Sequence, residues 1–402
     1  MIRMSAVKIT DRISAVPVLN PAMRIFDVVM KTDYGTSYNS YIVKGDSKSA
    51  LIETAHATFF SQYVETIKSV CDPGEIEYIV LNHCEPDHSG ALKELLDLCP
   101  NAKIYVSRAG SIYLKGITNR DDLPVIIAKD GDSIDLGGAT LRFISAPFLH
   151  WPDSMFTYCE EEKTVFTCDL LGSHYCEPYI LDTLVAYPEK YFDALKGYFD
   201  AIFGPFKSYV RAGLKKLSEL DYDNACTSHG PVLTRDGKLD KVLSLYTQWS
   251  ADIPSAEDIP VFYCSAYGNT EKLAQAISKG ILRAKPNAVS EAVDINSCDM
   301  SSLQARLNAC SAFAIGSPTI NSDAVAPVWE LLSHVDAINS KKRPALVFGS
   351  YGWSGEAVPN IIARLNGLRM SVFEDGMKVT FVPSDEDIKN AEELGFRFAS
   401  SF

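Results

Sequence analysis

A short stretch of the sequence carries four side chains of the kind that bind metal ions: His83, Glu85, Asp87 and His88. An apolar run at 78–81 precedes it and a helix-like pattern follows it, which predicts a turn from a strand into a helix. Loops at such turns can direct several side chains into one cleft. Buried carboxylates and imidazoles need partners, and a pair of divalent ions would supply them.

A plainer interpretation of the same stretch is a solvated helix cap. Polar and acidic side chains are favoured at a helix N-terminus, where they accept hydrogen bonds and meet the positive end of the helix dipole. A cap accounts for Asp87 or Ser89. It does not account for two histidines five positions apart with two acids between them, so the pattern favours a metal site.

Three further candidate ligands follow short apolar runs later in the same half of the chain: His150, Asp169 and His229. Taken singly, His150 or His229 is more often a satisfied core histidine, but in order with the first motif we interpret them as ligands. His174 lies five residues after Asp169. It either delivers protons near the metals or caps a loop, and the sequence leaves this choice open.

A second group of candidate binding residues lies at 263–270, where a strand pattern turns into a helix pattern. Small and hydroxyl side chains there expose backbone N–H groups and a helix N-terminus, which together suit one phosphate group. The segment is not the Gly-x-Gly-x-x-Gly fingerprint of dinucleotide binding. On its own it could also be an ordinary turn.

Two more polar loops, 316–321 and 349–355, follow later strand patterns. The second sets Tyr351 and Trp353 among glycines, as is needed to cover a flat ring closely, although ordinary packing would also explain these aromatics. Doubly wound sheets bind ligands at the carboxyl ends of their strands. Three such loops at successive strand ends therefore indicate a ligand site.

The elements that position these residues fall into two groups. Up to about residue 250, short strand patterns come first and helical patterns follow, whereas from 259 strands and helices alternate, which predicts a parallel sheet with helices on both faces. We expect an α/β protein with domains at 1–250 and 259–402 and a polar, proline-containing linker at 251–258. The expected strands are 40–43, 50–53, 103–106, 140–144, 260–264, 312–315, 345–349 and 379–382, and the expected helices are 91–96, 191–203, 206–220, 239–249 and 271–283.

Composition narrows the class of protein. The chain has 402 residues and a net charge of −13, which argues against nucleic acid as the main partner. No apolar run approaches the roughly 18 residues of a membrane helix, and no signal-peptide core follows the N-terminus, so we expect a cytoplasmic protein with no membrane partner. The ten cysteines include no Cys-x-x-Cys pair, which excludes a zinc ribbon or an appended rubredoxin module.

The candidate metal ligands resemble those of the metallo-β-lactamase superfamily, which implies an αββα sandwich. The zinc hydrolases usually have histidine where this chain has Glu85, and a carboxylate there makes a harder, more anionic site that suits iron better than zinc. By this resemblance, one iron is held by His83, Glu85, His150 and Asp169, and the other by Asp87, His88, His229 and the bridging Asp169. In some relatives the histidine equivalent to His150 swings away and water replaces it.

From about residue 259 the chain resembles flavodoxin, with its doubly wound parallel sheet, and this implies FMN as a cofactor. By resemblance, the phosphate is cradled by Ser265, Tyr267, Gly268, Asn269 and Thr270, the ribityl chain and ring are bordered by Pro318, Thr319 and Asn321, and the isoalloxazine is wrapped by Ser350, Tyr351, Gly352 and Trp353. The expected FMN site also includes Ser317, Ile320, Ser354 and Gly355.

Together the two halves resemble flavodiiron proteins over nearly the whole chain. That family reduces dioxygen to water, nitric oxide to nitrous oxide, or both, and the sequence leaves the gas open. The resemblance implies a separate electron donor, a rubredoxin-like protein or reduced deazaflavin, since no such module follows the second half. It also implies a head-to-tail homodimer, or a dimer of such dimers, in which one chain's flavin lies beside the partner's irons.

Two local features bear on this assignment. The stretch 20–27 lacks the tryptophan common in the family and can approach the active site, so it bears on substrate preference. A basic stripe could receive an acidic donor or be a solvated helix face, and it consists of Lys207, Arg211, Lys215 and Lys216. The competing classes are a metal-dependent hydrolase fused to a flavodoxin and an electron-transfer flavoprotein with a vestigial metal site. Glu85 argues against the hydrolase, and the complete set of candidate metal ligands argues against a vestigial metal site.

Overall fold

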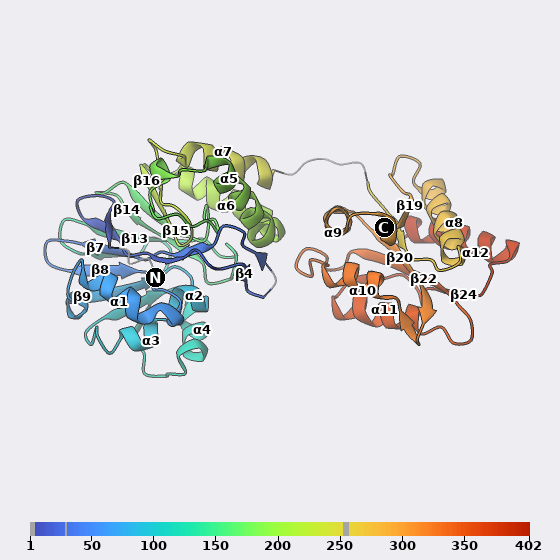
Figure 1. Ribbon diagram of the computed structural model, residues 1–402, viewed down its shortest axis with the longest axis horizontal. Coiled ribbons are helices and arrows are strands. Elements are labelled where there is room, and N and C mark those ends of the chain that lie inside the picture. Colours follow the sequence, from blue (N-terminus) through green and yellow to red (C-terminus); the bar gives the residue numbers. More distant parts are fainter. Residues whose placement is uncertain (1–4, 29, 252–256) are drawn as a thin grey trace. The chain divides into compact units, whose positions relative to one another are not determined.

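The computed structural model describes residues 5–28, 30–251 and 257–402 (Figure 1). The chain divides into two compact units, Met1–Asp252 and Ile253–Phe402. Most of the expected linker at 251–258 lies outside the described residues, and the domain limits at 250 and 259 stay a prediction.

Two β-sheets packed face to face form the middle of the first unit. Alternate residues of a strand point to the same face, so each sheet turns one set of apolar side chains inward. Tyr41 and Ile52 come from the first sheet and Phe143 and Phe166 from the second, and all four are buried in one core. The Tyr41 and Phe166 rings lie 5.3 Å apart, which fixes the spacing of the sheets at this point.

The first sheet is parallel from β8 onward and antiparallel before it. Its strands, in spatial order, are β1 (Val7–Lys8), β2 (Ile13–Ala15), β7 (Tyr41–Lys44), β8 (Ser49–Ile52), β9 (Ile76–Leu81), β10 (Lys103–Val106) and β11 (Val125–Ile127). The strands of the second sheet are β12 (Ser133–Asp135), β13 (Thr140–Ser145), β14 (Met155–Cys159), β15 (Thr164–Cys168), β16 (Asn224–Thr227) and β17 (Leu233–Thr234). Two separate pairs are β3 (Val18–Asn20) with β6 (Thr36–Tyr38) and β4 (Ile25–Phe26) with β5 (Met30–Lys31).

Helices cover the outer face of each sheet (Figure 1). Those on the first sheet are α1 (Phe60–Lys68), α2 (Pro86–Ser89), α3 (Leu92–Leu95) and α4 (Arg108–Thr118), and those on the second are α5 (Pro188–Tyr198), α6 (Lys207–Ser218) and α7 (Leu239–Ser250). The order helix, sheet, sheet, helix confirms the αββα sandwich that the resemblance implied.

The second unit is a doubly wound sheet, as expected. Its parallel strands are β19 (Ala292–Asp294), β18 (Val261–Tyr263), β20 (Phe313–Ile320), β22 (Pro344–Tyr351) and β23 (Ser371–Val372), with β24 (Met377–Thr380) also on β22 and β21 (Asp323–Ala324) antiparallel to β20. One face is covered by α8 (Asn269–Ala284) and α12 (Asp385–Ser400), and the other by α9 (Met300–Ala309), α10 (Ala326–Ser333) and α11 (Ala357–Gly367). At the crossing of α8 and α12, Gly280 and Gly395 lie against the facing backbone, where any Cβ would collide.

Some element limits differ from the expectation. The helix expected at 91–96 is α3, and a separate short helix that was not expected, α2, precedes it and contains two of the candidate ligands. The helix expected at 191–203 ends at Tyr198 and continues as a π-helical turn, Phe199–Phe203. The segments at 316–321 and 349–355 begin as strand rather than loop, because β20 continues to Ile320 and β22 to Tyr351, and the two strands pair as far as Pro318 and Ser350.

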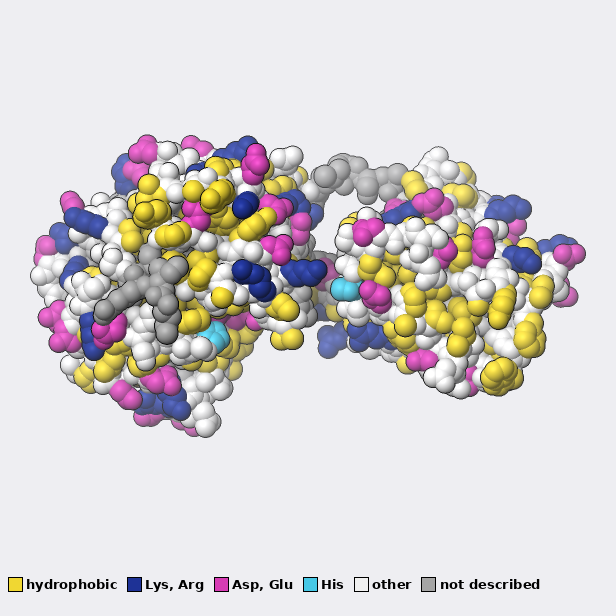
Figure 2. Space-filling model, in the orientation of Figure 1, with side chains coloured by type: hydrophobic (Ala, Val, Ile, Leu, Met, Phe, Trp, Pro, Cys, Tyr) yellow, Lys and Arg dark blue, Asp and Glu magenta, His cyan; other side chains and the backbone are white. Residues whose placement is uncertain are grey.

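Within the described ranges, no helix is both long and apolar enough to cross a membrane. On the face shown in Figure 2, basic and acidic side chains are interspersed over both units.

Candidate functional site

The first candidate ligands lie where β9 ends. Pro86 occupies the first position of α2, where its missing N–H costs no hydrogen bond, and this helix places Asp87 and His88 in its single turn. His83 and Glu85 precede it in the loop. All four side chains are buried, although they are polar.

His83, Glu85, His150 and Asp169 converge into one set of donor atoms. The Nε2 atoms of His83 and His150 lie 3.1 and 3.2 Å from Glu85 Oε2. They lie 3.6 and 3.5 Å from Asp169 Oδ2. Such separations suit ligands that each lie about 2 Å from one ion.

Asp87, His88 and His229 form a second set, which Asp169 also faces. His88 Nε2 lies 3.3 Å from Asp87 Oδ1, and His229 Nε2 lies 3.1 Å from Asp87 Oδ2. The same two nitrogens lie 3.2 and 3.5 Å from Asp169 Oδ1. Asp169 thus turns one oxygen to each set, which is the arrangement of a carboxylate bridging two ions.

Several buried polar atoms of the two ligand sets have no hydrogen-bond partner within the described part of the chain, and this bears on whether the sets could bind metal ions. Among the described residues, both Asp87 oxygens, Asp169 Oδ2 and His88 Nε2 are buried with no hydrogen-bond partner. Leaving such atoms unpaired is costly. Two cations between the sets would satisfy all of them, and a set of imidazoles and carboxylates with no thiolate suits iron.

The charges within the cluster support the same fit. Burial opposes ionisation of Asp169, but His88 and the hydrogen bond from His150 outweigh it and hold the pKa of this carboxyl well below its usual value. Burial alone would lower the pKa of His83. The hydrogen bond from His83 to Asp153 has the opposite effect, and the pKa of His83 lies well above its usual value. Carboxylates here are therefore ionised, and incoming metal would displace protons from the imidazoles.

His83 and His229 are each oriented by a hydrogen bond at the ring nitrogen Nδ1, which points away from the ligand sets. His83 Nδ1 lies 3.0 Å from Asp153 Oδ1, while Asp153 Oδ2 accepts a hydrogen bond from Cys84 N at 2.7 Å. His229 Nδ1 lies 2.7 Å from the carbonyl of Ser37. Bonds of this kind fix the tautomer, so that Nε2 is free for a metal. Asp153 was not among the sequence candidates, although it lies three residues after His150.

Tyr198 is a second residue that sequence reasoning missed. Its hydroxyl donates to Asp169 Oδ1 at 3.0 Å, and its ring packs edge-on against His174, with 4.8 Å between centroids. It lies in α5, which no local pattern connects to the ligands.

His174 lies beside the cluster in a buried position. Its Nδ1 lies 2.9 Å from Thr36 Oγ1, and its Nε2 has no partner among the residues described. Burial, and then the neighbouring His229, lower the pKa of His174 to about 3. It is therefore a neutral imidazole near neutral pH, and its role stays a prediction.

The stretch 20–27 does approach this cluster. Phe26 on β4 packs against His174, with 4.4 Å between ring centroids, and lies 6.0 Å from the His229 ring. Burial, followed by a hydrogen bond to Glu85, raises the pKa of Asp27 to about 6. The β4–β5 hairpin therefore places an aromatic ring and a carboxyl group at the ligands.

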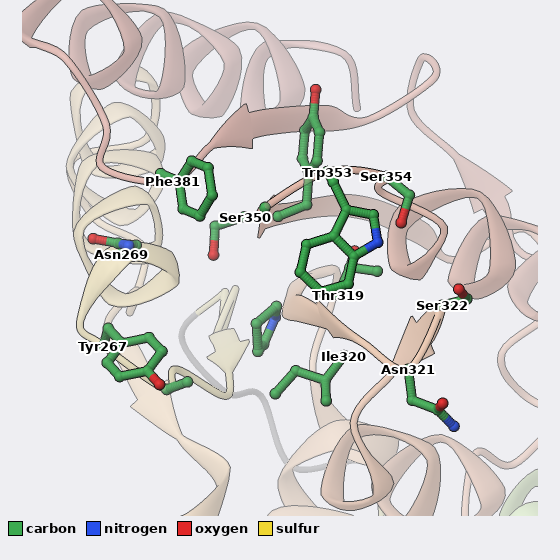
Figure 3. A pocket seen from close by; sticks show the side chains of 14 residues that line it. Tyr267, Asn269, Thr319, Ile320, Asn321, Ser322, Ser350, Trp353, Ser354 and Phe381 are labelled. Carbon is green, nitrogen blue, oxygen red and sulfur yellow. The ribbon is translucent and has the colours of Figure 1, made fainter.

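A pocket of about 350 Å³ lies at the carboxyl ends of β18, β20 and β22 in the second unit. Tyr267 and Trp353 face it from opposite sides (Figure 3) and are 90% and 92% exposed, so both faces of a flat ring could be covered here. Its lining residues are Ala266, Tyr267, Asn269, Pro318, Thr319, Ile320, Asn321, Ser322, Ser350, Tyr351, Gly352, Trp353, Ser354 and Phe381.

The N-terminus of α8 forms one end of this region. Gly268 caps the helix with φ +77°, a conformation that favours glycine. Ser265 Oγ is buried without a partner among the described residues, as expected of a hydroxyl that awaits an anion. An anionic phosphate is favoured at such a helix start.

Five expected FMN residues do not line the pocket: Ser265, Gly268, Thr270, Ser317 and Gly355. Thr270 Oγ1 instead lies 2.9 Å from Ser350 Oγ and holds that pocket residue in place. Ser317 Oγ donates to Pro318 O and accepts from Val325 N, so it serves the backbone.

The pocket also contains residues that the sequence did not indicate, chiefly Phe381 and Ser322. Phe381 follows β24 directly, so the strand-end rule could have found it. Asn321 and Ser322 both have positive φ and form the two-residue turn between β20 and β21. Ile320 and Asn321 thus reach the pocket from a hairpin.

Comparisons with known proteins agree with this geometry. The ODP family of beta-lactamases matches residues 36–230, and the flavodoxin family matches residues 261–395. The flavo-diiron protein FprA2 of Clostridium acetobutylicum is 53% identical and covers 99% of this chain and 100% of its own length. The anaerobic nitric oxide reductase flavorubredoxin of Vibrio vulnificus is 32% identical, covering 92% of this chain and 74% of its own.

A solved structure shows the same two units. The rubredoxin oxygen:oxidoreductase of Desulfovibrio gigas matches with a TM-score of 0.71 and 26% identity over 98% of each chain. Flavodiiron proteins carry FMN and a di-iron centre, and the residues of this chain fit both. Because the resemblance extends along full-length relatives and through both units, the chain belongs to the flavodiiron protein family.

Proposed function

We propose that this chain reduces dioxygen to water, nitric oxide to nitrous oxide, or both, at a di-iron centre that receives electrons through FMN. Asp169 carries the proposal, because each of its oxygens faces a different ligand set. The proposed iron ligands are His83, Glu85, Asp87, His88, His150, Asp169 and His229.

When bound, two ferrous ions and reduced FMN supply the electrons for reduction of a small diatomic. The chain's own residues hold these groups and keep the site dry. Trp151 lies edge-on to His83 at 5.1 Å, and Phe203 lies edge-on to His150 at 6.4 Å between centroids. Aromatic walls of this kind exclude bulk water and accept an apolar gas.

Proton supply falls to groups at the ligands. The Tyr198 hydroxyl donates its proton in a hydrogen bond to Asp169, and His174 Nε2 has no partner within the part of the chain that the structure describes. We assign His174 the role of a relay that passes protons inward as a neutral imidazole. Its low pKa argues against a role as a charged donor.

The names of two relatives support nitric oxide and dioxygen as candidate substrates of this chain. One is called a nitric oxide reductase flavorubredoxin and the other a rubredoxin oxygen:oxidoreductase. These names also support a rubredoxin-like protein as the external donor here, with reduced deazaflavin as the other candidate. The basic stripe on α6 is a weaker candidate for the donor site, because Arg211 donates to Ser250 O and Lys216 to Ser145 O.

Hydrolysis is the main competing activity, and Glu85 argues against it. Its Oε2 lies between the Nε2 atoms of His83 and His150, so the first set has two carboxylates and two imidazoles. This anionic set favours iron over zinc. Zinc alone in freshly purified protein would favour the hydrolase, and a reduced protein that consumes neither gas would favour simple electron transfer.

The test is stopped-flow oxidation of the anaerobically reduced protein by each gas in turn. The expected result is rapid oxidation of flavin and iron by at least one gas, with water or nitrous oxide as product. The matched control replaces His83 and His88 by alanine, which should leave FMN bound and abolish gas consumption. A control that reacts as fast as the unaltered protein would overturn the proposal.

The proposal includes a head-to-tail homodimer, or a dimer of such dimers. Each functional site lies within one unit, and electrons must cross from flavin to iron. A two-fold arrangement creates two such junctions at once.

The proposed FMN-binding residues are those of the sequence expectation, extended by Phe381 and Ser322. Exposed Tyr267 and Trp353 would cover the ring, and the start of α8 would receive the phosphate.

A further inference from the structure

His88 differs from His83 and His229 in the group that its Nδ1 atom contacts. Its Nε2 faces Asp87 and Asp169, so Nδ1 must carry the proton if His88 ligates metal. The contact recorded for Nδ1 is Cys168 Sγ at 4.0 Å, the outer limit for a hydrogen bond to sulfur. Sulfur is also a weak acceptor.

A buried carboxylate is available at the same place. Glu53 is 1% exposed, and one of its oxygens lies within 4.8 Å of both a His88 ring nitrogen and Cys168 Sγ. Glu53 Oε1 accepts from Asn82 N at 2.9 Å, whereas Oε2 is buried with no partner among the described residues. An unpartnered carboxylate oxygen and an imidazole N–H that lacks a good acceptor thus lie together.

Glu53 and the next residue, Thr54, are hydrogen-bonded to the segment 82–88, which carries the first candidate ligands. Glu53 binds the loop at Asn82, and the next residue, Thr54, donates to His88 O through its N at 2.8 Å and its Oγ1 at 2.6 Å. Glu53 itself has φ +60°, which is uncommon for a residue other than glycine. Strained residues of this kind persist where the surroundings hold them, often at functional sites.

We propose that Glu53 is the positioning residue for His88, with Oε2 accepting the Nδ1 proton as Asp153 does for His83. The inference rests on the proposed iron ligation by His88, and it adds a residue outside the ligand set. A carboxylate in this position fixes the ring plane and makes the imidazole a stronger donor to the metal. The same side chain thereby couples the end of β8 to both the loop and the ligand.

The test compares Glu53→Gln with the unaltered protein, both as full chains carrying FMN. A glutamine side chain has one acceptor oxygen and one NH₂ donor. Its NH₂ group would therefore face either the Asn82 N–H or the His88 Nδ1–H, and one of these two hydrogen bonds would be lost. The expected result is an affinity for ferrous iron about ten- to hundredfold weaker, measured by chelator competition. The midpoint potential of the di-iron centre should also rise, because a less basic imidazole stabilises ferric iron less.

Two control variants separate positioning from stability. Asp182→Asn alters another fully buried carboxylate of the same unit, one that accepts from Thr234 N and Oγ1 and belongs to none of the clusters of metal-type side chains. It should lower thermal stability but leave iron affinity and potential unchanged. Cys168→Ala removes the other neighbour of His88 Nδ1 and should change the potential little. If Cys168→Ala shifts the potential and Glu53→Gln does not, the inference is wrong.

A measurement on the unaltered chain covers the case in which Glu53→Gln does not fold. With zinc as a diamagnetic stand-in, the Nδ1 protons of His83 and His88 should both resonate far downfield, as carboxylate-bound imidazole protons do. A His88 proton without that shift would overturn the inference, as would a third metal equivalent held by Glu53. If the unaltered chain binds no iron, the proposed function fails as well, whereas normal iron binding that Glu53→Gln does not weaken removes this inference alone.

Discussion

The Tyr198 hydroxyl donates to Asp169 Oδ1, and this is the oxygen that also faces His88 and His229. One carboxylate oxygen therefore receives a tyrosine proton and belongs to a ligand set at the same time. The contact joins α5 on the outer face of one sheet to the cluster at the sheet edge.

Tyr198→Phe should lower the free energy of unfolding of the metal-free protein by about 1–3 kcal/mol, since it removes a buried hydrogen bond to a charged group. Chemical denaturation measures this value. Tyr246→Phe is the matched control, because the buried Tyr246 hydroxyl reaches Gly172 O only at 3.5 Å. Equal losses in the two variants would contradict the assigned strength of the Tyr198–Asp169 bond.

Asp153→Asn should weaken iron binding about ten- to hundredfold, because the amide offers one acceptor to two donors, His83 Nδ1 and Cys84 N. Iron content after dialysis against a graded chelator series measures the change. The variant should keep its FMN, since the flavin pocket lies in the other unit. Unaltered iron retention would show that Asp153 does not orient His83.

Trp353→Ala should weaken FMN binding about three- to tenfold, in line with roughly 0.5–1.5 kcal/mol for an aromatic stacking contact. Fluorescence titration of the flavin-free protein with FMN measures the affinity. Phe402→Ala is the control, because Phe402 is a partly exposed aromatic residue of the same unit that does not line the pocket. A larger loss in the control would exclude Trp353 as a wall of the flavin site.

Asp323 should make the hairpin at the flavin pocket sensitive to acid. Hydrogen bonds, first from Asn360 and then from Ala324 N and Trp329 Nε1, hold the pKa of Asp323 below its usual value of 3.8. The stability it contributes is therefore present above about pH 3.8 and is lost as pH falls through the lower, folded value.

The melting temperatures of the unaltered chain and of Asp323→Asn, compared across this pH range, provide the measurement. The difference between them should shrink as pH falls below the usual value. A difference independent of pH would show that ionised Asp323 does not stabilise the hairpin.

Mixing two inactive chains should restore activity if flavin and iron meet between subunits. One chain carries His83→Ala and His88→Ala, and the other carries Asn269→Asp and Trp353→Ala and is shown to lack FMN. Gas consumption by the mixture supports the head-to-tail dimer, because each hybrid contains one complete junction. No activity from heterodimers proven by mass measurement would rule out the arrangement.

The sequence predicted the seven candidate ligands because strand ends converge at one sheet edge, and ligand-type residues stand out there even without coordinates. It did not indicate Glu53, Asp153 or Tyr198. Asp153 and Tyr198 act through contacts with residues distant in sequence, such as Tyr198 with Asp169, 29 positions away, and the proposed role of Glu53 depends on His88, which is also distant. No local periodicity carries that information.

In the flavin unit, the order of elements followed from alternating strand and helix patterns, but most of the segment 316–321 and the first part of the segment 349–355 are strand rather than the expected loop. Serine and proline at 317–318 are typical of loops, yet they pair with β22 in the middle of a parallel sheet, and Thr319 pairs with β21. Tertiary pairing outweighed local preference there. Phe381 was missed because the expected strand at 379–382 included it, whereas β24 ends at Thr380.

The shared carboxylate of Asp169 has a consequence for how the centre fills. An ion in either ligand set would fix the orientation of Asp169 and so prepare the other set for its own ion. Loading should therefore be cooperative: at half-saturating iron, chains with two ions and chains with none should outnumber those with one.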